Sequence, residues 1–168
     1  MSVLEDIGSG SESARSSLED ALSLVRRAYE EAGELEDSAS GHGWAGVAEA
    51  MGNAREALES TVQVVEDAYE ATGTAIERLG EITSEMSSDE VARRLGEIGE
   101  GLDSARTGAG RAVELLDDVR TAAGQADAET LLQLADSAEE HLQSARESLE
   151  STVKDTESEA SDATTWGN

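Results

Sequence analysis

The sequence predicts an all-α protein in which four long, heptad-patterned antiparallel helices are arranged as two duplicated helical hairpins. A repeat begins at Ala14, Ala54, Ala105 and Ala145, each time followed by Arg. The first two copies start 40 residues apart, as do the last two, and the second pair follows the first by 91 residues. Apolar and small residues recur at alternating steps of four and three, and the 168 residues include no proline. A 3.5-residue period specifies supercoiled helix packing, and without proline long helices stay unbroken.

The first hairpin is expected to occupy residues 1–86. A Gly- and Ser-rich stretch precedes the first repeat, and Ser11 or Ser13 within it is the expected N-cap of the first helix. The segment 38–43, again rich in Gly and Ser, should form the turn. The second helix follows with an apolar seam over residues 47–82, far longer than an average helix.

The second hairpin is expected to occupy residues 87–155. Ser87 and Glu90 fit a capping box that opens the third helix, in which each residue satisfies the backbone amide of the other. Residues 124–127 should turn the chain into the fourth helix. Long helices joined by such short turns usually lie antiparallel.

The apolar seam of the fourth helix can be followed as far as Thr152, after which Thr156 and Glu159 interrupt it. Residues 156–168 are rich in Ser, Thr and acidic side chains. Such a composition buries too little apolar surface to order the chain, so this segment is expected to be a disordered acidic tail.

The charge balance is extreme, because 12 basic residues face 38 acidic ones and give a formal net charge of −26. Three interpretations stay open. An acidic surface with Lys154 as its one lysine is typical of halophilic adaptation, but it would also attract a basic partner or imitate a nucleic-acid backbone. Direct binding to nucleic acid or anionic membranes is disfavoured, since both need basic patches. No apolar run approaches the roughly 18 residues of a membrane span.

We expect no enzymatic activity, cofactor or metal, because no reactive set of side chains can be recognised. The histidines are His42, in a Gly-rich turn, and His141, beside the seam. Di-iron bundles pair Glu with His three residues apart on inward faces. Here Ala39 and Ala138 stand three residues before the histidines. No nucleophile elbow surrounds any serine, and no EF-hand loop is present.

The aromatic residues are few, with two Trp, two Tyr and no Phe. Trp44 lies in the first turn and is followed by Gly46. It either packs over its own hairpin end or, as an exposed Trp, anchors a partner. We interpret Trp44 and Gly46 as the candidate partner-binding residues. Tyr29 and Tyr69 hold equivalent places in the first two repeats and are expected to pack beside the seam with their hydroxyls in water.

Two long amphipathic helices joined by the Trp-x-Gly turn at Trp44 and Gly46 resemble the WXG-motif (ESAT-like) proteins over the first hairpin. The resemblance implies a helical hairpin, usually paired as a dimer, that is exported by type VII secretion. The sequence departs from the family in two respects. Gly33 and Gly73 stand four residues after the tyrosines, where the family's export signal has an acid. Ala135 stands where the repeat would place a second Trp.

Three functions are therefore carried forward, all of them non-enzymatic. The first is an acidic helical-bundle protein that binds another protein through its helix faces, as a substrate or partner of type VII secretion. The second is a salt-adapted cytosolic adaptor or scaffold, which is expected to be a monomer. Pairing of the chain as a homo-oligomer stays open as a separate possibility. The third is an acidic decoy of a DNA-binding protein. The N-terminal sequence has neither a basic region nor an apolar core, so the expected location is the cytoplasm, or outside the cell without a Sec signal peptide.

Overall fold

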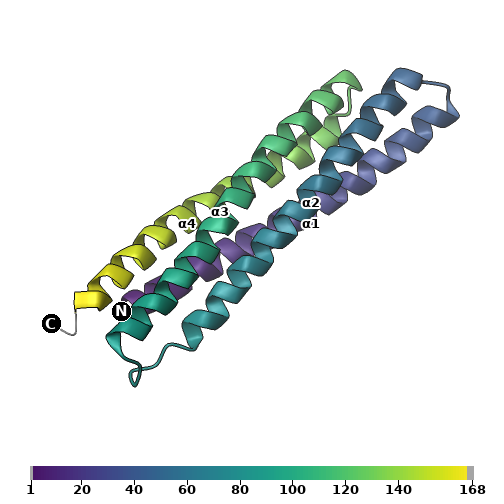
Figure 1. The fold of residues 1–168 in the computed structure, drawn as a ribbon. Coiled ribbons are helices and arrows are strands. Elements are labelled where there is room, and N and C mark those ends of the chain that lie inside the picture. The colour runs from purple at the N-terminus through teal and green to yellow at the C-terminus, as the bar shows by residue number, and fades with distance from the viewer. Residues whose placement is uncertain (1, 166–168) are drawn as a thin grey trace.

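The computed structural model describes residues 2–165, which form one antiparallel bundle of four helices (Figure 1). The helices are α1 (Val3–Gly41), α2 (Ala45–Gly80), α3 (Ser88–Gln125) and α4 (Glu129–Thr165). Each helix packs on the next in sequence, and α4 packs back on α1, so the four close a ring around one core. The predicted fold class, all-α with four long antiparallel helices, is confirmed.

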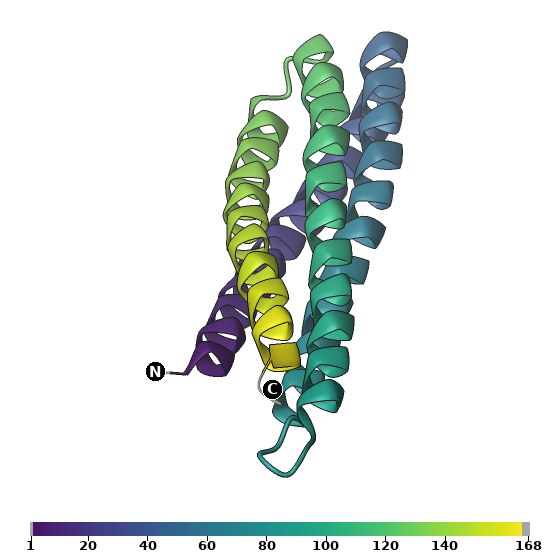
Figure 2. The same cartoon turned by 60° about the vertical axis from the view of Figure 1, so that its left-hand side comes forward.

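The two ends of the bundle differ in what they carry (Figures 1 and 2). The start of α1, the end of α4 and the longer α2–α3 loop lie at one end. The short α1–α2 and α3–α4 turns lie at the other, which we call the turn end and define as residues 34–52 and 118–136. The expected hairpins 1–86 and 87–155 correspond to α1–α2 and α3–α4, which join through α2 against α3 and α1 against α4. Within residues 2–165, no helix has the length and apolar character needed to cross a bilayer.

The core follows the predicted heptad seams and extends beyond them at Ile7, in the stretch that was expected to precede the first helix. Its largest fully buried side chains include Ile7, Leu18, Met51, Leu58 and Leu95. Many other core positions are alanine, which lets the helices approach closely but buries less apolar area than leucine would.

The two hairpins are not superimposable copies, because their turns fall at different points of the repeat. The first turn begins at His42, 28 residues after Ala14, and the second at Ala126, 21 residues after Ala105. The difference of 7 residues is one heptad, which leaves the seam on the same face while changing which residues meet across the hairpin. Ala135, aligned with Trp44 by the repeat, therefore lies buried inside α4 rather than in a turn.

The structure corrects the expected start of the first helix. Helix α1 begins at Val3, and its N-cap is Ser2. The Ser2 hydroxyl accepts from the Glu5 amide at 3.2 Å, and the Glu5 carboxylate accepts from the Ser2 amide at 3.3 Å, a complete capping box. Ser11 lies inside the helix, buried, with its hydroxyl donating to the carbonyl of Ile7 at 2.8 Å. Neither Ser11 nor Ser13 is a cap.

The N-cap of α3 is Ser87, as predicted, but only half of the expected box is present. The Ser87 hydroxyl accepts from the Glu90 amide at 3.2 Å. The Glu90 carboxylate lies instead 3.4 Å from Arg94 and 3.9 Å from Arg93. Arginines one turn further along the helix thus take the carboxylate that a capping box would use.

The structure also differs from the expected disordered tail at 156–168. Helix α4 continues to Thr165, and both Thr156 and Ala163 are fully buried. The Thr156 hydroxyl donates to the carbonyl of Thr152 at 2.7 Å. The threonine can therefore occupy a buried seam position without leaving its hydroxyl unpaired. Residues 166–168 of the expected tail, with Trp166, lie outside the described residues.

Candidate partner-binding site at the α1–α2 turn

Trp44 sits in a tight turn that ends α1 and starts α2. Gly43 has φ of +74°, a left-handed conformation that glycine adopts freely. The Trp44 amide donates to the carbonyl of Ala39 at 2.8 Å, and the Gly43 amide to that of Ser40 at 3.2 Å. These two bonds make a Schellman motif.

The α3–α4 turn repeats this motif with a different side chain at the position of Trp44. The Ala128 amide donates to the carbonyl of Ala123 at 2.9 Å, and the Asp127 amide to that of Gly124 at 3.4 Å. Asp127 has the left-handed φ of 52°. Ala128 therefore corresponds to Trp44, and it is 9% exposed. The same turn is built in this chain with a buried methyl group, so the turn itself does not require an aromatic residue.

The Trp44 side chain is 57% exposed, and within residues 2–165 the other exposed large apolar side chain is Val3, at the opposite end. The sequence left open whether Trp44 packs over the end of its own hairpin. Because more than half of the side chain is exposed, most of it lies outside the bundle. The His42 ring stacks on the indole with centroids 4.8 Å apart and planes at 22°. His42 Nδ1 lies 2.8 Å from the carbonyl of Ser38 and donates to it, since a carbonyl can only accept.

Gly46, the second predicted site residue, lies in the first turn of α2. A Cβ atom added at Gly46 would meet no other atom within 4 Å, and the same is true at Gly41. Neither residue has a positive φ. Close packing and backbone conformation therefore require no glycine at either position, and the surface beside Trp44 is left clear.

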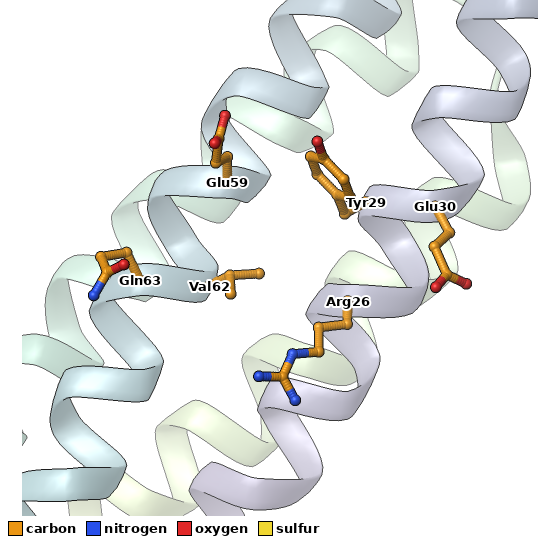
Figure 3. Close-up of a pocket in the computed structure, with 6 residues that line it drawn as sticks. All are labelled: Arg26, Tyr29, Glu30, Glu59, Val62 and Gln63. Carbon is orange, nitrogen blue, oxygen red and sulfur yellow. The ribbon is translucent and has the colours of Figure 1, made fainter.

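A groove of about 440 Å³ runs along the outer side of the first hairpin (Figure 3). It is lined by Arg26, Tyr29, Glu30, Glu59, Val62 and Gln63. Tyr29 and Val62 project between the two helices, and Arg26 pairs with Glu66 at 2.5 Å. The lining holds no nucleophile beside a base, so the groove offers packing and charge rather than a reactive arrangement.

Two arginine–tyrosine pairs in the first hairpin were not predicted from the sequence. The Arg15 guanidinium lies over the Tyr69 ring at 4.7 Å, and that of Arg55 over the Tyr29 ring at 5.1 Å. Cations are attracted to the negative face of an aromatic ring. The antiparallel hairpin places the start of each repeat against the later part of the other, so both pairs depend on the register between α1 and α2.

The Tyr29 hydroxyl was expected to lie in water, but in the structure it also has a partner within the protein. It accepts from Arg55 Nη2 at 3.1 Å, while Arg55 Nη1 lies 3.1 Å from Glu36. Hydrogen bonds to Tyr29 and Glu36 raise the pKa of Arg55 above its ordinary value. A Cβ at Gly33 would lie 3.7 Å from the Arg55 side chain, an ordinary van der Waals contact, so the arginine does not require a glycine at this position.

Arg120 is the most heavily paired base in residues 2–165. It bonds Asp117 at 2.8 Å and Asp136 at 2.7 Å, and it also pairs with Glu139. Partial burial lowers the pKa of Arg120, but the hydrogen bonds to Asp136 and Glu139 outweigh burial and leave it above its ordinary value. These contacts tie α3 to α4 and engage all three nitrogens of the guanidinium.

The remaining titratable residues of the described part of the chain, 2–165, form no recognisable reactive centre. His141 on α4 lies 4.0 Å from Asp20 on α1, with both side chains substantially exposed. Among residues 2–165, no three His, Cys, Asp or Glu side chains gather into a group that could hold a metal ion. Comparisons with protein-family models, with curated proteins and with solved structures find no match to this chain.

Proposed function

We propose that this chain is a non-enzymatic interaction protein, an acidic four-helix bundle that binds another protein through the Trp44 turn. One comparison within the chain carries the proposal: Trp44 is 57% exposed where Ala128, in the same motif, is 9% exposed. Leaving a large aromatic ring in water is costly, and exposed Trp is a preferred anchor at protein interfaces. The clear surface at Gly46 allows a partner to approach the ring.

The type VII secretion reading rests on the same Trp44-x-Gly46 turn. In that family a hairpin usually pairs with another hairpin, and here α3 and α4 cover the apolar face of α1 and α2 within one chain. The covered seam equally favours the alternative, a self-contained cytosolic adaptor. A partner would then meet the turn end and the outer helix faces.

Substitution of Trp44 tests the partner-binding role. Trp44→Ala should leave the helical content unchanged, because the turn already tolerates Ala128, and should weaken capture of the native partner by about 30-fold or more, the usual loss for an anchoring Trp. Affinity pull-down from the native host, quantified against wild type, measures the loss, and circular dichroism measures helicity. Val3→Ala, which trims the other exposed apolar side chain, is the matched control. If Trp44→Ala unfolds the hairpin, or Val3→Ala loses the same proteins, the site is wrong.

Localisation separates the two readings. An immunoblot of washed native cells and of the culture medium, beside a cytosolic marker, should find the chain in the medium without lysis if it is a type VII substrate. Retention inside the cells would contradict the secretion reading and leave the adaptor and the acidic decoy of a DNA-binding protein, which a pull-down would separate.

A further inference from the structure

The turn end of the bundle carries acidic residues and only one basic residue. Residues 34–52 and 118–136 contain eight acidic residues and one basic residue. The acidic residues are Glu34, Glu36, Asp37, Glu49, Asp118, Asp127, Glu129 and Asp136. The single base is Arg120, whose guanidinium is already held by Asp117, Asp136 and Glu139. A partner that meets Trp44 therefore meets a surface with no available cation.

The opposite end has a different character although it belongs to the same acidic chain. Near that end lie Arg78, Arg93, Arg94 and Lys154, as the bounds of α2, α3 and α4 show. Arg93 and Arg94 pair with glutamates, while Arg78 and Lys154 have no ion pair within residues 2–165. The lack of an arginine or lysine without an ion pair is thus a property of the turn end and does not follow from the net charge alone.

The aromatic rings of the first hairpin differ in whether an arginine of the protein covers them. The structure describes three of them outside histidine: Tyr29, Tyr69 and Trp44. Each tyrosine ring carries an arginine guanidinium from the neighbouring helix. Trp44 carries none, although Trp is the aromatic side chain that attracts cations most strongly. His42 covers one side of the indole, and the surface beside it is clear at Gly41 and Gly46.

We infer that the Trp44 turn receives a basic segment of another protein, with an arginine or lysine side chain placed over the free part of the indole. The remaining cations of that segment lie against the carboxylates of the turn end. Charge complementarity selects this partner, since a nucleic acid or an anionic lipid surface would be repelled. The inference rests on the proposed function and adds the chemistry of the partner to it.

The test uses the full chain with Trp166→Phe, so that Trp44 is the only indole. The probe is a capped eight-residue peptide that alternates Arg and Ser, with peptides that carry Glu or Gln in place of Arg as controls. The Arg peptide should change the Trp44 emission saturably, and the control peptides should not. By titration calorimetry, Trp44→Ala should weaken binding of the Arg peptide at least 10-fold.

A matched pair of charge reversals separates local from overall attraction. Asp37→Lys with Glu49→Lys changes two exposed carboxylates of the turn end that have no ion pair within residues 2–165. Glu77→Lys with Glu85→Lys makes the same charge change near the other end, also at exposed residues without such a pair. The first double variant should bind the Arg peptide at least 10-fold more weakly, and the second should stay within about threefold of wild type.

Equal affinity of wild type and Trp44→Ala for the Arg peptide would overturn the inference and show attraction to net charge only. Equal losses in the two charge-reversed proteins would do the same. If Trp44→Ala still loses its native partner in that case, the proposed function stands without a cationic partner.

Discussion

Five hydroxyl side chains lie in the core of the bundle: Ser11, Thr61, Thr72, Thr152 and Thr156. Each donates to the carbonyl four residues earlier in its own helix, at 2.6–2.8 Å. A buried hydroxyl without a partner would destabilise the fold, but these are satisfied locally and present only their methyl or methylene groups to the neighbouring helix. Threonine can therefore occupy a seam position almost as an apolar residue does.

Gly10 shows how closely α1 approaches α4. A Cβ atom at this position would clash with Thr152 Oγ1, whose proton is already bonded to the carbonyl of Ser148 at 2.6 Å. We expect Gly10→Ala to lower the free energy of unfolding by about 1–3 kcal/mol, the usual cost of overpacking, despite the better helix propensity of Ala. Urea denaturation followed by circular dichroism measures the change.

Gly96 in α3 provides the control for helix propensity. A Cβ there would meet no atom within 4 Å, so Gly96→Ala should raise the free energy of unfolding by up to about 1 kcal/mol. Adding Thr152→Ala to Gly10→Ala should recover much of the loss, because it removes the clashing oxygen. Stabilisation by both glycine substitutions would show that α1 and α4 are less closely packed than the structure has them.

Among the helices, the heptad seam predicted from the sequence coincides with the buried stripe of each helix. The α1–α2 and α3–α4 turns also fall near their predicted positions. The helix ends were harder to predict. Gly10 and Ser11 look like a linker in the sequence, yet they lie where α1 meets α4 and small residues are needed. Local composition cannot show this, because the requirement comes from a helix some 140 residues away.

The same reasoning explains the candidate site. Trp44 and Gly46 could be selected from the sequence because a lone aromatic residue in a Gly-rich turn is conspicuous. The arginines over Tyr29 and Tyr69 were missed, since they depend on the hairpin register. That register differs by one heptad between the hairpins, and a one-heptad shift leaves the seam pattern unchanged.

The final turns of α4 give a prediction for the whole element. Ala163 is fully buried and its neighbour Thr164 is exposed. Ala163→Asp should lower the free energy of unfolding by about 2–3 kcal/mol, because it buries a charge, whereas Thr164→Asp should stay within about 0.5 kcal/mol of wild type. Thermal unfolding of the two variants in the same buffer makes the comparison. Identical midpoints would mean that α4 is frayed in this region.

On the scale of the whole molecule, the negative charge is unevenly divided among the helices. Helix α1 holds ten acidic and three basic residues, and α4 holds ten acidic and two basic residues. These helices lie side by side. Repulsion across their shared outer surface opposes folding, and the alanine-rich seam between the helices contributes less burial than a leucine seam would.

Salt should therefore stabilise the bundle. The Debye length falls from about 10 Å at 0.1 M to about 3 Å at 1 M, which screens repulsion between carboxylates on α1 and α4. The ion pairs of the structure are mostly exposed, and exposed pairs contribute little, so their screening costs less than the repulsion relieved. Raising NaCl from 0.1 to 1 M at pH 7 should add roughly 2 kcal/mol, or about 4–8 °C in Tm for a domain of this size.

A charge-reduced variant identifies the cause of that salt response. Glu12→Gln, Glu19→Gln, Glu140→Gln and Glu150→Gln together remove four exposed charges of α1 and α4 that have no ion pair within residues 2–165. This variant should be more stable than wild type in 0.1 M NaCl and should gain less from 1 M NaCl, because less repulsion remains to be screened. General salting-out would act on both proteins equally.

A wild-type Tm that is flat or falls with salt would instead show that the ion pairs outweigh the repulsion. The acidic surface would then need another explanation than adaptation to salt.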